Sequence, residues 1–89
     1  MIPSVEEARH VENYRVWLRF NDGTEGEIDL ERELWGEMFE PLRDINLFHM
    51  LRVEPDLDTI VWPNGADFSP EFLYNECRAA KTSLQKTGD

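Results

Sequence analysis

Residues 14–20 read Y-R-V-W-L-R-F, and this strict apolar and polar alternation constrains the fold more than any other stretch. The side chains of a strand point alternately to the two sides of a sheet. The alternation over 14–20 therefore predicts a strand with one buried and one solvated face. N-D-G follows, and these residues tolerate the positive backbone angles of a tight hairpin turn. The return stretch, T-E-G-E-I-D-L, presents acids to the outward arginines. We therefore expect an antiparallel hairpin with cross-strand charge pairing.

The two faces of this strand carry different chemistry. We expect the core to receive Tyr14, Val16, Leu18 and Phe20. The outward side carries Arg15, Trp17 and Arg19, and a tryptophan between two arginines has the composition of interface hot spots. These three residues are therefore a candidate contact surface. The alternative is that Trp17 covers the second side of the sheet beneath a helix, where Trp17→Ala would lower stability rather than remove a complex.

Three further strands are expected from the same rules. A short strand precedes the hairpin over 5–11, and a second apolar pair lies at 47–53 and 59–62, joined by a turn at 55–58. His49 alternates with the leucines of the 47–53 strand. This pattern predicts that His49 lies at the rim of the core.

Helical spacing occupies two other parts of the chain. Between 31 and 42 the apolar residues fall on one helical face, but Gly36 and Pro41 interrupt it, so two short helical turns are expected. The sequence S-P-E at 69–71 then supplies an N-cap, a first-turn proline and a first-turn acid. A longer helix therefore begins there.

The length of 89 residues fits one domain, because a chain of this size lacks the mass for two cores. We expect a single α+β domain over 1–80, with short antiparallel strands in the order βββ, helical turns, ββ, and then a C-terminal helix. The polar tail, 81–89, is expected to fray.

Charge limits the partners of this domain. The chain has 19 acids against 9 lysines and arginines, a net charge of −10. Nucleic acids and anionic membranes are bound through Lys and Arg, so this balance argues against both as direct partners. Between 22 and 58, twelve acids face three arginines. One interpretation is a solvated face; the alternative is a docking surface for a basic protein, whose association the field would accelerate.

The same composition bears on location. A lone cysteine, Cys77, excludes an internal disulfide and fits a reducing compartment. The first residues have neither the basic region nor the apolar segment of a secretory leader, and no apolar run exceeds three residues. We therefore expect no membrane span and a cytoplasmic location.

Catalytic and metal motifs are missing from the sequence. Asp56 and Asp58 flank a hairpin turn without the ligand number that calcium needs. His10, His49 and Cys77 lack the paired spacing of a zinc site. There is no nucleophile elbow and no glycine-rich phosphate loop. We expect no enzyme activity, no metal and no cofactor.

The most specialised stretch is I-V-W-P-N-G-A-D-F-S-P, residues 60–70. Its P-N-G sequence favours a tight turn, and the Asp67 side chain can accept backbone hydrogen bonds, so the stretch predicts a joint between a strand and a helix. The alternative is that Trp62, Asn64 and Asp67 line a shallow pocket for a cationic or hydrogen-bonding ligand.

These pieces together resemble a known family. Y-R-V-W-L-R-F-N-D-G, E-I-D-L, F-E-P-L-R-D, Phe48 and T-I-V-W-P-N-G-A-D-F-S-P-E-F-L-Y occur in the order typical of a small bacterial family, the domain of unknown function 2442. The resemblance runs from about Val5 to Tyr74, with W-P-N-G-A-D as its most specific mark. It implies an α+β fold of short antiparallel strands with a C-terminal helix.

The resemblance supplies no activity or catalytic residue. It implies an antitoxin-like role, with a small basic protein from a neighbouring gene as the partner. Our first hypothesis is thus an acidic interaction module, with a homodimer as a further candidate assembly. The alternative, from a different class, is a small-ligand or metal-binding domain that uses the loop around Asn64 and Asp67.

Overall fold

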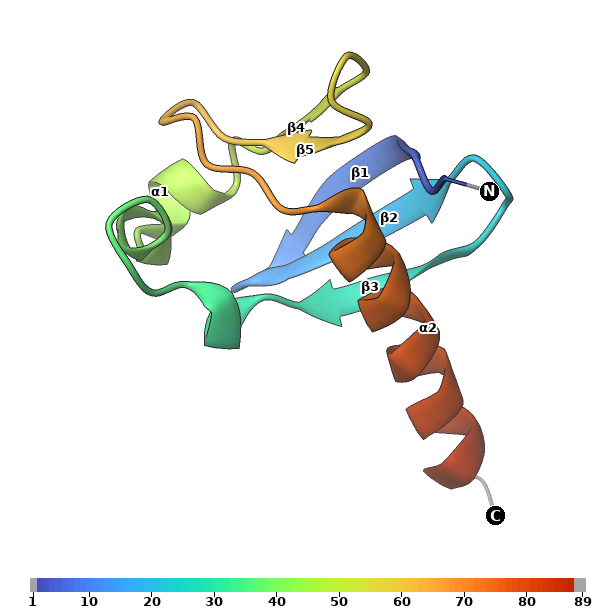
Figure 1. Ribbon diagram of the computed structural model, residues 1–89. Helices are drawn as coiled ribbons and strands as arrows, with labels where there is room; N and C mark the ends of the chain where they lie inside the picture. Colours follow the sequence, from blue (N-terminus) through green and yellow to red (C-terminus); the bar gives the residue numbers. More distant parts are fainter. Residues whose placement is uncertain (1, 88–89) are drawn as a thin grey trace.

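The computed structural model describes residues 2–87, with side chains described for 2–80 (Figure 1). A three-stranded antiparallel sheet has the order β1 (Val5–Glu12), β2 (Arg15–Phe20), β3 (Glu25–Asp29). A separate two-stranded hairpin consists of β4 (Arg52–Glu54) and β5 (Thr59–Val61). The helical elements are the 3₁₀ helices η1 (Glu31–Glu33) and η2 (Glu40–Arg43) and the α-helices α1 (Ile45–Phe48) and α2 (Pro70–Thr87). The predicted α+β class and order of elements are confirmed.

The central strand β2 divides the sheet into an inner and an outer face. Val16, Leu18 and Phe20 are fully buried on the inner face, as the alternation predicts. Helix α2 packs against this face: Gly26 of β3 lies opposite Leu18, and a Cβ at Gly26 would meet the Cβ of Cys77 at 3.9 Å. A larger side chain at Gly26 would therefore push α2 away from the sheet.

The core is closed by the segments that follow the sheet. The β4–β5 hairpin lies along β1, and the Val5 amide donates to the Asp58 carbonyl at 2.9 Å (Figure 1). Fully or almost fully buried side chains come from every layer, and they include Leu30, Leu34, Leu42, Phe48, Ile60, Trp62, Leu73 and Cys77. Burying each large apolar side chain of this kind contributes about 1.5–3 kcal/mol, which lets so short a chain fold without a disulfide.

The prediction of a strand over 47–53 is wrong in its first half. Residues 45–48 form helix α1, which begins where the Asp44 side chain accepts from the Asn46 amide at 3.0 Å. Phe48 is thereby turned into the core. His49 follows as the C-cap residue and is exposed rather than at the core rim, with Nδ1 3.1 Å from the Ile45 carbonyl. Short apolar runs fit either period, and here the aspartate cap and the burial of Phe48 select the helix.

The two short helical turns expected between 31 and 42 are present as η1 and η2, but their apolar residues do not share one face. Leu34 and Leu42 are fully buried, whereas Trp35 is 70% exposed and Met38 46% exposed. The reason is that η1 ends at Glu33, with Leu34 in a non-helical conformation (φ −89°, ψ 66°), and that Gly36 then takes a left-handed φ of +88°. The side chains on either side of this reversal therefore point in different directions.

The expected frayed tail, 81–89, falls on residues whose side chains lie outside the described part of the chain. The same holds for Leu84, which the helical spacing of the apolar residues after 70 predicts to be buried. The described part of α2 includes Leu73 and Cys77, both fully buried as the helical spacing predicts.

One side-chain bond ties α2 to the turn between β2 and β3. The Tyr74 hydroxyl donates to Asp22 Oδ2 at 2.6 Å, and its ring packs edge-on against Phe20 at 5.2 Å. This hydrogen bond, aided by the Thr24 amide, holds the pKa of Asp22 below its ordinary value. A carboxylate with a lowered pKa stabilises the fold above its unfolded pKa, and that stability is lost as the pH falls through the folded pKa.

Tyr74→Phe should therefore lower the free energy of unfolding at about pH 7. The difference should shrink as the pH falls below the ordinary aspartate pKa of about 3.9 and through the lower pKa of Asp22 in the folded protein. Phenylalanine keeps the ring contact with Phe20, so only the hydroxyl is removed. Urea unfolding of both proteins at several pH values measures the effect. A difference of the same size at every pH would contradict the link between this bond and the Asp22 charge.

Candidate interaction surfaces

The outer face of the sheet presents the predicted arginines of β2 among acids of its neighbours. Arg15 Nη2 lies 3.1 Å from Glu27 Oε1, so charge pairing across the hairpin is confirmed here. Arg19 pairs instead with β1, at 3.1 Å from Glu6 and 3.0 Å from Glu7, and the Glu7 bond raises the pKa of Arg19. Exposed pairs of this kind contribute about 0–1 kcal/mol each. They neutralise part of this face, since Glu12, Glu25 and Asp29 of the same strands form no ion pair within residues 2–80.

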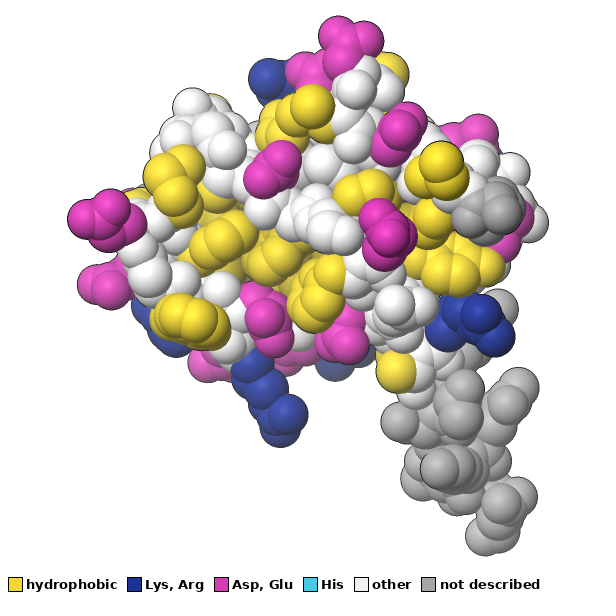
Figure 2. Space-filling model, viewed as in Figure 1, with side chains coloured by type: hydrophobic (Ala, Val, Ile, Leu, Met, Phe, Trp, Pro, Cys, Tyr) yellow, Lys and Arg dark blue, Asp and Glu magenta, His cyan; other side chains and the backbone are white. Residues whose placement is uncertain are grey.

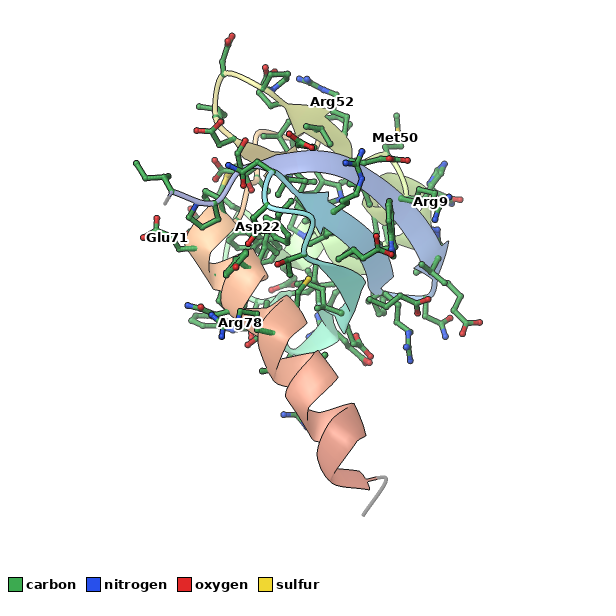
Figure 3. The ribbon with its side chains drawn as sticks, turned by 90° about the vertical axis from the view of Figure 1, so that its right-hand side faces the viewer. Arg9, Asp22, Met50, Arg52, Glu71 and Arg78 are labelled. Carbon is green, nitrogen blue, oxygen red and sulfur yellow. The ribbon has the colours of Figure 1, made fainter. Side chains whose placement is uncertain are left out.

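Trp17 lies on the same outer face and is partly covered. The Arg9 guanidinium of the neighbouring strand stacks over its ring, with Cζ 4.4 Å from the ring centroid, a cation–π contact. Figure 3 places Arg9 on the side of the sheet away from α2. Trp17 therefore does not pack beneath the helix, which covers the opposite face. A partner on this surface would have to displace Arg9 and compete with the arginine–glutamate pairs.

Trp62 is part of the core and not of any surface. Its side chain is 1% exposed, its indole N–H donates to the Phe48 carbonyl at 2.7 Å, and its ring contacts those of Phe48 and Phe68. A ligand arriving from solvent cannot reach this ring. Trp62 therefore cannot line the shallow pocket that the alternative interpretation of residues 60–70 requires.

The turn after Trp62 is closed by its own residues. The Trp62 amide donates to the Ala66 carbonyl, and the Gly65 amide donates to the Trp62 carbonyl, both at 2.9 Å. Gly65 has a φ of +88°, which a residue with a side chain adopts only with strain. Asn64 uses both ends of its amide: Oδ1 accepts from the Ala66 amide at 3.1 Å, and Nδ2 donates to the Met38 carbonyl at 3.0 Å. The amide of Asn64 is therefore already occupied.

Asp67 does not play the expected local role. It is exposed and forms an isolated backbone bridge with Val61, but its carboxylate accepts no hydrogen bond from any residue between 2 and 80. The buried polar contact of this segment comes instead from Thr59, whose hydroxyl donates to the Phe68 carbonyl at 2.6 Å. Residues 60–70 thus form the predicted strand-to-helix joint, with one side chain, Asn64, reaching to a distant loop.

That distant loop, residues 34–41, was not singled out by the sequence patterns. It runs from the end of η1 into the first two residues of η2, and it exposes Trp35 and Met38 to solvent. Hydrogen bonds fix it from below: Arg43 Nε donates to the Leu34 carbonyl at 2.8 Å, and the Glu40 amide donates to the Gly36 carbonyl at 2.9 Å. The sequence signal was Gly36, a break in helical spacing directly after a tryptophan.

Acidic side chains border the 34–41 loop on both sides along the chain. Glu37, Glu40 and Pro41 line a depression of about 400 Å³. A second depression of about 410 Å³ is lined by Asp29, Glu31, Arg32, Glu33 and Glu76. Among residues 2–80, no acid of the 31–44 segment takes part in an ion pair. Unpaired negative charge therefore borders this loop, as it also does the sheet strands at Glu12, Glu25 and Asp29.

The residues considered for metal binding do not form one cluster, although two of them, His10 and His49, lie near each other. Within the described residues, no cluster of three or more His, Cys, Asp or Glu side chains has a geometry that could hold a metal ion. Cys77 is buried in the core. His10 and His49 approach with ring centroids 6.4 Å apart, and Asp58 accepts from the Ser4 hydroxyl at 2.9 Å.

This protein is a small α+β domain with a three-stranded meander sheet, a short hairpin and a C-terminal helix. The W-P-N-G-A-D joint connects the hairpin to the helix. The most distinctive surface of the domain is the 34–41 loop. The chain belongs to the family described as proteins of unknown function, DUF2442, whose profile matches residues 5–79. This range includes β1 through most of the described part of α2, and it confirms the family resemblance. Comparison with curated proteins and with solved structures returned no match. No helix within the described residues combines the length and apolar character needed to span a bilayer.

Proposed function

We propose that this protein is a non-catalytic interaction module that binds a basic partner protein in the cytoplasm. The observation that carries the proposal is the uneven neutralisation of its charge. Two arginines of β2, Arg15 and Arg19, pair with three glutamates of the sheet, whereas none of the five acids of the 31–44 segment forms an ion pair among the described side chains. A concentrated unbalanced field accelerates encounter with a partner of the opposite charge and disfavours acidic competitors.

The family resemblance suggests a particular form of this interaction. In an antitoxin-like role, the partner would be a small basic protein encoded by a neighbouring gene and harmful when free. Binding through a negative surface would suit that role, because fast association limits the time for which the partner is free. Expression of the basic neighbour with and without this protein, with growth as the measurement, tests the extension separately.

The charge hypothesis predicts a salt-sensitive complex with a basic protein. We expect a stoichiometric partner with a high isoelectric point to co-purify with this protein at about 50 mM salt and to dissociate at about 500 mM, as the Debye length falls from above 10 Å to below 5 Å. Glu37→Gln with Glu40→Gln should weaken that complex. The control, Glu12→Gln with Glu25→Gln, removes the same charge from the strands of the sheet and should have less effect.

Two results would count against this function. One is a partner that is itself acidic, and the other is a complex whose affinity is the same at both salt concentrations. If both pairs of glutamate variants weaken the complex equally, the charge acts through the whole molecule rather than through the 31–44 segment.

A further inference from the structure

We propose that the 34–41 loop is the docking site of this protein and that its occupant is a basic amphipathic helix of the partner. Apolar side chains of that helix would pack against Trp35 and Met38, and flanking Lys or Arg side chains would lie near Glu37 and Glu40. The inference rests on the proposed function for the charge of the partner. It adds where the partner binds and what kind of segment it presents.

The exposure of Trp35 is the first argument. A tryptophan has the largest apolar area of any residue, yet this one is 70% exposed, and Met38 beside it is 46% exposed. Phe39 follows in sequence and is half-buried, with its ring stacked on Phe68 at 4.7 Å. Figure 2 shows hydrophobic side chains in a band across this face of the molecule, with acidic side chains along its borders. Tryptophan and methionine are enriched in interface cores, where a few aromatic anchors supply most of the affinity.

The rigidity of the loop is the second argument. The backbone that displays these side chains is fixed by the Asn64 and Arg43 side chains, which donate to the Met38 and Leu34 carbonyls. The Gly65 turn also packs against the loop, since a Cβ at Gly65 would lie 3.7 Å from Met38 Cε. An ordered loop loses little conformational entropy on binding, so more of the contact energy appears as affinity. The joint at 60–70 thus has a second consequence, because it holds the docking loop in place.

The charge around the loop selects the occupant. Acids at 31 and 33, with Arg32 between them, precede Trp35, and acids at 37 and 40 follow it. This net negative charge on both sides suits a helix whose apolar stripe is flanked by basic residues. The depression of about 400 Å³ bounded by Glu37, Glu40 and Pro41 can accept a Lys or Arg side chain, with its aliphatic stem on the proline and its cation near the carboxylates. A second copy of this chain fits less well, because each copy has a net charge of −10 and would bring like charges together.

Another acidic turn with an exposed apolar residue serves as the comparison. Leu57 is 53% exposed between Asp56 and Asp58. Two acids of this turn already have partners, because Glu54 pairs with Arg52 at 2.9 Å and Asp58 accepts a hydrogen bond from Ser4. The Arg52 bond also lowers the pKa of Glu54. This turn offers one aliphatic side chain where the 34–41 loop offers an aromatic ring and a methionine. Leu57 is therefore the matched control position.

The test is a nuclear magnetic resonance titration of the full chain with a synthetic helical peptide of leucine and lysine, roughly 18 residues long, about five turns, with every leucine on one face. A scrambled peptide of the same composition has no apolar face. The chain has three tryptophans, so three indole N–H signals report on Trp17, Trp35 and Trp62 separately. We expect the Trp35 indole and the amides of 34–41 to shift, while the signal of buried Trp62 stays unchanged.

Two variants measure how much each side chain contributes to the affinity. Trp35→Ser should lower the affinity for the helical peptide about fivefold or more, as expected for an interface anchor. Leu57→Ser should leave that affinity within about twofold of the original value. Because Trp35 is largely exposed, the Ser variant is expected to keep its melting temperature. The scrambled peptide should bind more weakly than the helical one at equal charge.

The alternative outcomes separate the two proposals. Binding centred on 54–58 or on the outer face around Trp17, or equal affinity for both peptides, would overturn the docking site while leaving a basic partner in place. No binding of either peptide at about 20 mM salt, where charges are least screened, would overturn the docking site and count against the basic partner as well. Concentration-dependent shifts of Trp35 without peptide would show that a second copy covers the loop, and would also overturn the inference.

Discussion

Trp62→Ala should lower the free energy of unfolding by about 3–5 kcal/mol, a large part of the 5–15 kcal/mol typical of a small domain. The ring is 1% exposed and contacts Phe48 and Phe68, so its removal leaves a cavity that neighbouring side chains fill only in part. The Phe48 carbonyl would also lose its indole donor at 2.7 Å. Urea unfolding followed by circular dichroism measures the change.

Trp35→Ala is the matched control, because it is the same chemical change at a site that is 70% exposed. We expect a loss within about 0.5 kcal/mol, the usual range for surface substitutions. Losses of similar size at the two positions would contradict the assignment of Trp62 to the core and Trp35 to a surface. Such a result would also return the ring of Trp62 to consideration as part of a binding pocket.

Phe48→Ala should have an effect of comparable size, about 3–5 kcal/mol. Phe48 is fully buried at the end of α1, where its ring packs against those of Tyr14, His10 and Trp62. The substitution empties the place where the β1–β2 turn, α1 and β5 meet. Thermal and urea unfolding measure the loss.

Met50→Ala is the control for Phe48, because a continuous strand over 47–53 would place both residues on the same face. In the structure Phe48 is fully buried and Met50 is 50% exposed, so we expect the Met50 variant to lose no more than about 1 kcal/mol. Equal losses would support the strand and contradict helix α1.

The first hairpin could be predicted because its signals are local. Alternation over 14–20 assigns each side chain to a face, and N-D-G closes the turn whatever the rest of the chain does. The start of α2 is predictable for the same reason, since its capping serine and first-turn proline are neighbours in sequence. Burial of Val16, Leu18 and Leu73 confirms both patterns.

The 45–48 helix and the exposure of Trp35 could not be predicted in the same way. A stretch as short as L-F-H-M-L-R-V fits a strand or a helical turn. The Asp44 cap, together with the contacts of Phe48 with distant rings, decides between them. The spacing of Trp35 fits the apolar face of a continuous helix, but η1 ends at Glu33 and Gly36 has a left-handed backbone. In both cases the local preference is weaker than the free energy of tertiary packing.

The candidate site divides in a similar way. Arg15, Trp17 and Arg19 were predicted to share a face and they do, but their ion pairs and the Arg9 cation over Trp17 depend on the register of β1, which no short-range pattern reveals. Asn64 was recognised as a special residue within its turn. Its bond to Met38 spans 26 positions, and it links the family signature to the loop that we propose as the docking site.

Local sequence patterns are sufficient to predict the α+β class, the hairpin, the C-terminal helix and the acidic character, because periodicity, turn chemistry and charge are properties of neighbouring residues. Which tryptophan is buried and which is exposed depends instead on tertiary packing. Whether an indole lies in the core or in solvent depends on the side chains that surround it in space. The side chains around Trp62 come from α1 and from the joint before α2. Trp35 instead lies between the end of η1 and the left-handed Gly36, where it stays exposed.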